Sequence, residues 1–240
     1  MIPKKIHYCW FGGKPLPENA KKCINSWKKF FPDYEIIEWN ESNYNIYKNN
    51  YIKKAYEQKK YAFVSDYVRF DVLYDYGGIY FDVDVEVINR FDDKLLERGF
   101  FGFEYDYKLI NPGLGMGAHP KTNIYKDILN FYEQKEFSLS LNKINNSVET
   151  VCTYTTNILV KHGLNLNEVY QIVEDIVILP KEFLNPYDYL TGKLKITNNT
   201  LSIHWYNMSW LSFPLKIKVY LARPIRRFIK AVCFKKNKGV

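Results

Sequence analysis

Two aspartates separated by a single residue, Asp82 and Asp84, form the pair in this sequence best suited to chemistry. Residues 79–87 alternate between apolar and polar side chains, which is typical of a strand with one buried face. Both carboxylates are therefore expected on the same face, roughly 6–7 Å apart along the chain. Oxygen ligands at this spacing suit Mg²⁺ or Mn²⁺, which commonly share them with substrate phosphates. The pair predicts a divalent-cation site able to neutralise a diphosphate leaving group.

Three other interpretations of this pair stay open at this point. A half-exposed strand with an acidic outer face produces the same pattern without binding a metal. Haloacid-dehalogenase-like phosphotransferases and phosphatases also carry a DxD pair, although usually close to the N-terminus, whereas here the pair follows two predicted strands and Gly77-Gly78. A non-catalytic, membrane-associated binding protein that kept the fold of an enzyme is the third alternative.

A second charged pair precedes the aspartates along the chain. Asp66 and Arg69 are three residues apart, so on a helix they share one face with Phe70 and Leu73. A charged pair among apolar neighbours is either a structural ion pair or a ligand clamp, and a purely structural buried pair is costly. Because the arginine guanidinium matches phosphate oxygens bidentately, Arg69 is a candidate for gripping phosphate.

These residues together resemble a known family. The sequence SDYVR at residues 65–69, followed by GGIYFDVDV at residues 77–85, resembles the DxD-containing sugar-transfer region of glycosyltransferase family 32. That family includes yeast initiating mannosyltransferases and many bacterial capsule and lipopolysaccharide enzymes. The pattern is also similar to the glucosylating domains of large clostridial toxins. The run IPKKIHYCWFGG at residues 2–13 matches the opening strand of the family, and the rest of the chain matches only in patches.

The resemblance implies an α/β domain of the GT-A type, which is Rossmann-like, binds nucleotide sugars and has a mixed central sheet flanked by helices. It implies a retaining hexosyltransferase that needs Mn²⁺ or Mg²⁺. The donor would be a nucleotide-diphosphate sugar, with a UDP-sugar favoured, carrying a hexose or N-acetylhexosamine. The acceptor would be a glycan, lipid-linked in some cases, in the synthesis of a bacterial surface polysaccharide such as capsule, O-antigen or lipooligosaccharide.

The resemblance also implies roles for single residues. Trp10 would stack on the nucleobase beside Tyr8, and Tyr80 would lie against the ribose or the phosphates. Asp82 would contact the ribose or the water shell of the metal. The expected catalytic residues are those that hold the sugar and diphosphate and the one that ligates the metal directly: Asp66, Arg69 and Asp84.

A histidine near the end of the body adds a third metal ligand to the prediction. His204 is followed by Ser209-Trp210, and family members often end their catalytic domain with a similar arrangement. The imidazole would join Asp82 and Asp84 at the metal or contact the diphosphate, and Ser209 and Trp210 would close over the donor. The other histidines lack such neighbours and are expected to be structural: His7, His119 and His162.

Apolar periodicity and turn residues predict the elements that position these groups. Strands are expected at residues 6–11, 34–39, 100–104, 176–179 and 201–205. Helices are expected at 17–31, 50–60, 65–76, 122–134 and 152–162, and residues 111–117 are expected to form a connecting loop. Strands alternating with helices predict one α/β domain over residues 1–212.

Charge distribution separates a tail from this body. The 240-residue chain has a net charge of +8, and residues 213–240 hold nine Lys or Arg and no Asp or Glu. Residues 1–212 are nearly neutral, which argues against a nucleic-acid partner. After Pro224 an apolar stripe and a basic stripe predict a basic amphipathic helix that binds anionic lipid or docks on the body.

The expected location follows from two features. Four scattered cysteines and the lack of a signal peptide or membrane-spanning run predict a cytoplasmic protein. The basic tail predicts that this protein is peripheral to the inner face of the membrane.

Overall fold

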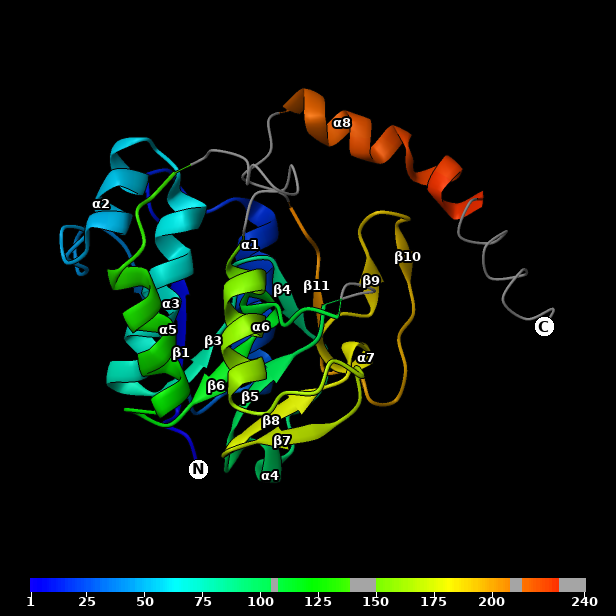
Figure 1. Ribbon diagram of the computed structural model, residues 1–240. Helices are drawn as coiled ribbons and strands as arrows, with labels where there is room; N and C mark the ends of the chain where they lie inside the picture. Colours follow the sequence, from blue (N-terminus) through cyan, green and yellow to red (C-terminus); the bar gives the residue numbers. More distant parts are fainter. Residues whose placement is uncertain (105–107, 139–149, 208–212, 229–240) are drawn as a thin grey trace.

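The computed structural model describes residues 1–104, 108–138, 150–207 and 213–228. A central sheet runs through the molecule, with the helices α2 (Asn50–Glu57), α3 (Tyr61–Tyr76), α5 (Asn123–Glu133) and α6 (Val151–Lys161) on one side of it (Figure 1). The helix α8 (Phe213–Leu221) lies apart from the sheet, beyond the hairpin of β9 (Tyr187–Asp188) and β10 (Lys193–Leu194). None of the described helices is both long enough and apolar enough to cross a membrane.

The sheet is mixed, with seven strands in the order β2-β1-β3-β6-β5-β8-β7. The strands β2, β1, β3, β5 and β8 run in one direction, and β6 and β7 run in the other. Together with the flanking helices this confirms the predicted α/β architecture. The strands span Lys5–Cys9 (β1), Glu35–Trp39 (β2), Gly78–Tyr80 (β3), Gly99–Gly102 (β5), Met116–Ala118 (β6), Gln171–Val173 (β7) and Ile176–Leu179 (β8).

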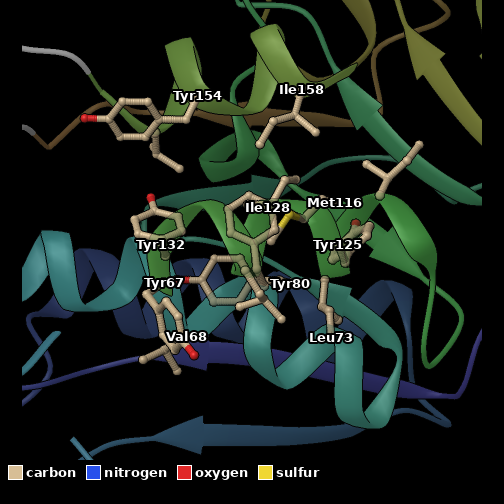
Figure 2. Close-up of a cluster of buried hydrophobic side chains, with 14 of the residues drawn as sticks. Tyr67, Val68, Leu73, Tyr80, Met116, Tyr125, Ile128, Tyr132, Tyr154 and Ile158 are labelled. Atoms are coloured by element: carbon tan, nitrogen blue, oxygen red, sulfur yellow. The ribbon is translucent and has the colours of Figure 1, made fainter. Parts of the chain in front are cut away.

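One face of the sheet is covered by four helices, α2 (Asn50–Glu57), α3 (Tyr61–Tyr76), α5 (Asn123–Glu133) and α6 (Val151–Lys161). Aromatic and aliphatic side chains fill the space between them, and Figure 2 shows Tyr67, Ile128, Tyr132 and Ile158 meeting there. Tyr80 projects into the same cluster from β3. Because strand side chains alternate between faces, its neighbour Phe81 belongs to the core on the opposite side.

The opposite face is covered by α1 (Glu18–Phe30) and a small second sheet of two antiparallel strands, β4 (Val85–Val87) and β11 (Ser202–His204). Trp27 of α1 is fully buried, and its indole N–H donates to the carbonyl of Val85 at 2.7 Å. Three short helices complete the described part of the chain: α4 (Asp93–Leu96), η1 (Pro112–Leu114) and α7 (Lys181–Leu184).

The prediction of a single strand over residues 79–87 is wrong. The segment forms β3 in the large sheet and β4 in the small one, and the intervening turn is closed by the Val85 amide donating to the Asp82 carbonyl at 3.0 Å. An alternating pattern cannot distinguish one strand from two short strands joined by a tight turn, since both set every second residue against the same core. The aspartates therefore lie in a turn, where their positions depend on tertiary contacts.

The prediction of a connecting loop over residues 111–117 is also wrong. The segment contains η1 and most of β6, the strand that joins β3 to β5. Gly117 makes this possible, because a Cβ there would lie 2.6 Å from the Phe100 ring of the neighbouring strand. Glycine in a strand commonly marks such a close approach, although its low strand propensity makes the strand hard to recognise.

The predicted amphipathic helix after Pro224 is not confirmed. The helix α8 begins earlier, residues 223–228 continue in helical conformation, and the part of the prediction beyond residue 228 lies outside the described residues. Of the four cysteines, the three in the described residues, Cys9, Cys23 and Cys152, are buried free thiols.

Candidate functional site

The candidate site lies at the edge of the sheet where the parallel strands end. Trp10 follows β1, Asp82 follows β3 and Glu104 follows β5, while Asn111 precedes the antiparallel β6 and so reaches the same edge. In open α/β sheets, ligands bind beyond the carboxyl ends of the strands. Asp66 joins them from the first half of α3, which runs toward the start of β3.

Arg69 is the centre of an ionic cluster at this edge. Its guanidinium is 3.0 Å from Asp66 Oδ1 and 3.2 Å from Asp82 Oδ1, and its Nε donates to the Ser65 carbonyl at 3.1 Å. The guanidinium also lies over the Tyr80 ring, 5.1 Å from its centroid, while the Tyr80 hydroxyl donates to Asp82 at 3.0 Å. The structure thus brings together the predicted residues of both motifs.

Burial and the neighbouring charges shift the pKa values of Asp66 and Arg69. Burial raises the pKa of Asp66 to about 6, with Arg69 opposing the shift and Asp82 adding to it. For Arg69 burial works against the charge, but the surrounding carboxylates outweigh it and raise its pKa. Arg69 therefore keeps its positive charge, and the Asp66 carboxyl group can accept or donate a hydrogen bond near pH 6.

Asp82, Asp84 and His204 form a cluster with metal-ligand geometry. Each offers a ligand atom, and these atoms lie within 4.8 Å of one another. The pairing of β4 with β11 sets His204 opposite Val85, so the imidazole Nε2 lies 3.0 Å from Asp84 Oδ1. The second Asp84 oxygen accepts from the Asn207 amide at 2.7 Å. All three predicted metal ligands are therefore brought to one place.

The donor set of this cluster fits a divalent cation. Burial alone would raise the pKa of Asp84, but His204 and the Asn207 amide lower it further, so the carboxyl group is ionised. Two carboxylates and one imidazole are ligands that Mn²⁺ accepts, and Mg²⁺ accepts the oxygens. Among the described residues, the buried Nδ1 of His204 has no hydrogen-bond partner, so within this part of the chain only Nε2 forms a polar contact.

Glu104 belongs to the site although the sequence analysis did not identify it. Burial raises its pKa, while hydrogen bonds from the side chains of Asn111, Cys152 and Tyr206 lower it in part. The Tyr206 ring in turn packs against His204, with centroids 4.0 Å apart. The position of Glu104 just after β5 could have identified it from the sequence, because β5 ends at the same edge of the sheet as β3.

A short loop is fixed against Asp82. A Cβ added to Gly113 would lie 2.3 Å from Asp82 Oδ2, so the backbone of η1 touches this carboxylate. The loop is anchored on both sides: Asn111 Oδ1 accepts from the Gly113 amide at 2.8 Å, and Thr156 Oγ1 accepts from the Ile110 amide at 2.8 Å. The loop therefore restricts the positions open to Asp82.

A cavity of about 330 Å³ lies beyond the ends of β1 and β2. Its lining is polar except for one indole: Trp10, Gly13, Lys14, Glu38, Asn40, Glu41 and Ser42. Tyr8, predicted to bind the donor, does not line this cavity. It is buried because its side chain points into the core beside Trp27, and its hydroxyl donates to Glu38 Oε2 at 2.6 Å. Tyr8 thus supports the cavity through Glu38.

The remaining two predicted donor-binding residues, Ser209 and Trp210, lie outside the described residues, so their roles stay predictions.

Comparison with known proteins gives the following matches. Residues 17–101 match the family model described as the glycosyltransferase sugar-binding region containing a DXD motif. Inositol phosphoceramide mannosyltransferase 3 of Schizosaccharomyces pombe is 35% identical over 107 residues, which cover 40% of this chain and 27% of that enzyme. The uncharacterized glycosyltransferase L373 of Acanthamoeba polyphaga mimivirus is 25% identical over 206 residues, covering 80% of this chain and 76% of the viral protein.

Among solved structures, the PaToxG glycosyltransferase superposes with a TM-score of 0.47 at 19% identity, covering 67% of this chain and 68% of the other. The chain spans only about a quarter of the length of the Schizosaccharomyces enzyme that it matches. The matched region nevertheless contains Asp66, Arg69, Asp82 and Asp84, the residues on which the resemblance depends. Residues 17–101 of this chain are thus similar to the glycosyltransferase sugar-binding region containing a DXD motif, and the chain resembles glycosyltransferases in sequence.

Proposed function

We propose that this protein is a retaining, metal-dependent glycosyltransferase that moves a hexose or N-acetylhexosamine from a nucleotide-diphosphate sugar to a glycan acceptor. The observation that carries the proposal is the convergence of Asp82, Asp84 and His204 within 4.8 Å, with the Arg69 guanidinium 3.2 Å from Asp82. Such a group of ligands beside a fixed arginine has the chemistry needed to bind a diphosphate.

The donor would extend along the sheet edge. Its nucleobase would occupy the cavity beside Trp10, where Glu38 and Glu41 can accept hydrogen bonds from base N–H groups. Its diphosphate would lie at Arg69 and the Asp82–Asp84–His204 cluster. A divalent cation bound there would neutralise charge on the leaving diphosphate as a Lewis acid.

In the reaction, an acceptor hydroxyl oxygen forms a bond to the anomeric carbon, and the bond from that carbon to the phosphate oxygen breaks. The nucleoside diphosphate leaves with the bonding electron pair, and its oxygen takes the proton of the acceptor hydroxyl. Arg69, held by Asp66 and Asp82, is already oriented to meet the negative charge that develops on this oxygen. Retention follows if attack and departure occur on the same face of the sugar.

The two carboxyl groups that do not bind metal in this scheme would hold the transferred sugar. Asp66 and Glu104 both act electrostatically on the buried Cys152, where burial and then these two carboxyl groups raise the pKa of the thiol. Carboxylates are strong acceptors for sugar hydroxyls, and two of them on different elements would fix the orientation of the ring. Glu104 thus adds a carboxyl group that interacts electrostatically with His204 and that the sequence motifs do not mark.

The sugar and acceptor are proposed from the comparisons and the resemblance. The names of the Schizosaccharomyces relatives specify transfer of mannose, a hexose, which supports the proposed sugar class. We retain a UDP-sugar as the favoured donor, with a GDP-sugar as the alternative to be tested. The acceptor is proposed to be a lipid-linked glycan of a bacterial surface polysaccharide.

The test is release of nucleoside diphosphate by purified protein incubated with UDP- and GDP-sugars in the presence of Mn²⁺. Turnover of at least one nucleotide sugar is expected, and it should stop when a chelator removes the metal. A phosphatase would instead cleave a simple phosphate ester under the same conditions. Cleavage of such an ester without turnover of any nucleotide sugar would overturn the proposal.

The Asp84→Asn variant should lower this turnover at least ~100-fold, because loss of one ligand charge weakens metal binding and transition-state stabilisation. Glu86→Gln is the matched control. Glu86 lies two residues further along and accepts from the Trp205 indole at 2.8 Å, away from the ligand cluster. Circular dichroism would check that both variants fold. Near-normal turnover by folded Asp84→Asn would remove the metal from the mechanism.

A further inference from the structure

The helical tail presents its apolar side chains to solvent and its arginines to the body. Ile217, Leu221 and Ile225 follow one another at intervals of four residues and Phe228 comes three later, so they share one helical stripe. Leu221, Ile225 and Phe228 are 73%, 65% and 72% exposed. A helix that docks on a protein only for stability would instead bury this stripe.

The opposite face of the tail is attached to the β9–β10 hairpin. Arg223 donates to the Tyr189 carbonyl at 3.2 Å and to the Tyr187 hydroxyl at 2.9 Å, and Arg227 donates to the Thr191 carbonyl at 2.5 Å. The turn of the hairpin leaves room for both guanidinium groups at Gly192, where φ is 68° and a Cβ would lie 3.1–3.2 Å from them. The arginines therefore hold the helix against the hairpin, and the exposed apolar stripe lies on its other face.

We propose that this outward stripe lies in the surface of a bilayer containing anionic lipids, as in the cytoplasmic leaflet. Residues 213–240 carry nine basic side chains and no acidic one, whereas residues 1–212 are close to neutral. Apolar side chains can enter the boundary between headgroups and acyl chains while the lysines meet anionic headgroups. A second copy of the chain fits less well, because two such tails placed face to face would bring like charges together.

Membrane docking goes beyond the proposed reaction and does not depend on it. It would place the β9–β10 hairpin next to the bilayer. Because this hairpin precedes β11, which carries His204, the sheet edge with the candidate site is linked to the membrane through a short stretch of chain. An enzyme held in this way would meet a lipid-linked acceptor at the surface.

The experiment compares binding of the full chain to vesicles of phosphatidylcholine alone and of phosphatidylcholine with roughly 30% phosphatidylglycerol. The variant Leu221→Gln/Ile225→Gln/Phe228→Gln removes the stripe but keeps good helix-forming residues. The matched control, Val169→Gln/Tyr170→Gln/Ile172→Gln, replaces three apolar side chains that are 50%, 56% and 50% exposed elsewhere on the surface.

The unmodified chain should bind the anionic vesicles at least ~10-fold more tightly than the neutral ones. The stripe variant should lose about 10-fold or more of this affinity, while the control should bind like the unmodified chain. Equal vesicle binding by the stripe variant would overturn the proposal. A dimer in solution that the stripe variant converts to monomer would do so too, by showing that a second copy covers the stripe. Release of nucleoside diphosphate without vesicles should be unchanged in both variants, so failure here is distinguishable from failure of the proposed reaction.

Discussion

The pKa values of the carboxyl groups of the site are shifted in different directions although the groups lie close together. Asp84 has a lowered pKa because His204 and the Asn207 amide outweigh the effect of burial, whereas burial raises the pKa values of Asp66 and Glu104. Groups whose environments push their pKa values apart commonly divide the work of a site. Here the ionised Asp84 is suited to a metal, and the other two are suited to neutral sugar hydroxyls.

The Glu104→Gln variant tests this division. Gln keeps the shape but removes the charge, so kcat should fall about 10- to 100-fold, the kinetic equivalent of one charge-assisted hydrogen bond of about 1.5–3 kcal/mol. Metal affinity should be nearly unchanged. The exposed Glu97 provides the control variant Glu97→Gln. The measurement is steady-state kinetics with the donor varied, and a kcat equal to that of the control would place Glu104 outside the reaction.

At the scale of elements, the site depends on a turn, a loop and a returning strand. The turn between β3 and β4 carries both aspartates, η1 supports Asp82, and β11 brings His204 beside Asp84. None of these elements is long and each has few hydrogen bonds of its own, so their positions depend on their neighbours. A small change in one of them should therefore displace a ligand.

Gly113→Ala is such a change. The new methyl group would lie 2.3 Å from Asp82 Oδ2, so Asp82 or the loop has to move. A displacement of this size should lower Mn²⁺ affinity and turnover at least ~10-fold. Gly163→Ala is the control, because a Cβ there meets no atom within 4 Å although φ is 100°. That control should lose stability but keep its Mn²⁺ affinity. Titration calorimetry would measure the Mn²⁺ affinity of both variants. Equal affinity in the two would show that η1 does not restrict Asp82.

The sequence predicts most of these elements but not all of the site. The helix α3 and the strand β8 were predicted closely, because apolar periodicity and the Gly77-Gly78 pair mark them. Gly77, at φ 62°, does end α3, with its amide bonded to the Leu73 carbonyl. Asp66, Arg69, Asp82 and Asp84 were found because they form a local motif.

The rest of the site could not be found from local patterns. β6 was missed because its glycines reflect a close approach to Phe100 on another strand, which the sequence does not show. Glu104 was missed because its importance comes from meeting Asn111, Cys152 and Tyr206, residues that only the tertiary fold assembles. The apolar alternation in residues 79–87 was correct, but it did not reveal the turn.

At the scale of the whole molecule, stability toward acid depends partly on a histidine remote from the ligand cluster. His7 is fully buried on β1, where its Nε2 lies 2.9 Å from the Gly77 carbonyl and its Nδ1 accepts from the Trp39 indole at 3.0 Å. Burial lowers the pKa of His7 to about 4. Adding a proton to Nδ1 would set two N–H donors against each other, so the neutral form is the one that fits.

The expected pH dependence follows from this shift. In the unfolded chain His7 binds a proton below about pH 6.5, whereas in the folded chain it does so only near pH 4. The stability that neutral His7 contributes is therefore full above pH 6.5 and is lost as the pH falls below it. Between pH 7 and pH 5 the loss should be about 2 kcal/mol in the free energy of unfolding.

Urea denaturation of the His7→Gln variant would measure this loss of unfolding free energy, because Gln offers a donor and an acceptor but does not titrate. This variant should be less stable at pH 7 yet lose less between pH 7 and pH 5. His162→Gln should change the slope in the opposite direction: burial lowers the pKa of His162, but Glu174 and Asp127 raise it further. The same slope in His7→Gln and the unmodified protein would contradict the prediction.

The contact between Asp84 and His204 joins residues separated by 120 positions along the chain. During synthesis, the two aspartates emerge from the ribosome long before His204, and β11 emerges among the last parts of the body. A nascent chain can therefore form most of the large sheet while it still lacks the third ligand. Under the proposed function, catalytic competence should arise only when translation of the body is nearly complete, so an unfinished chain would not consume activated sugars.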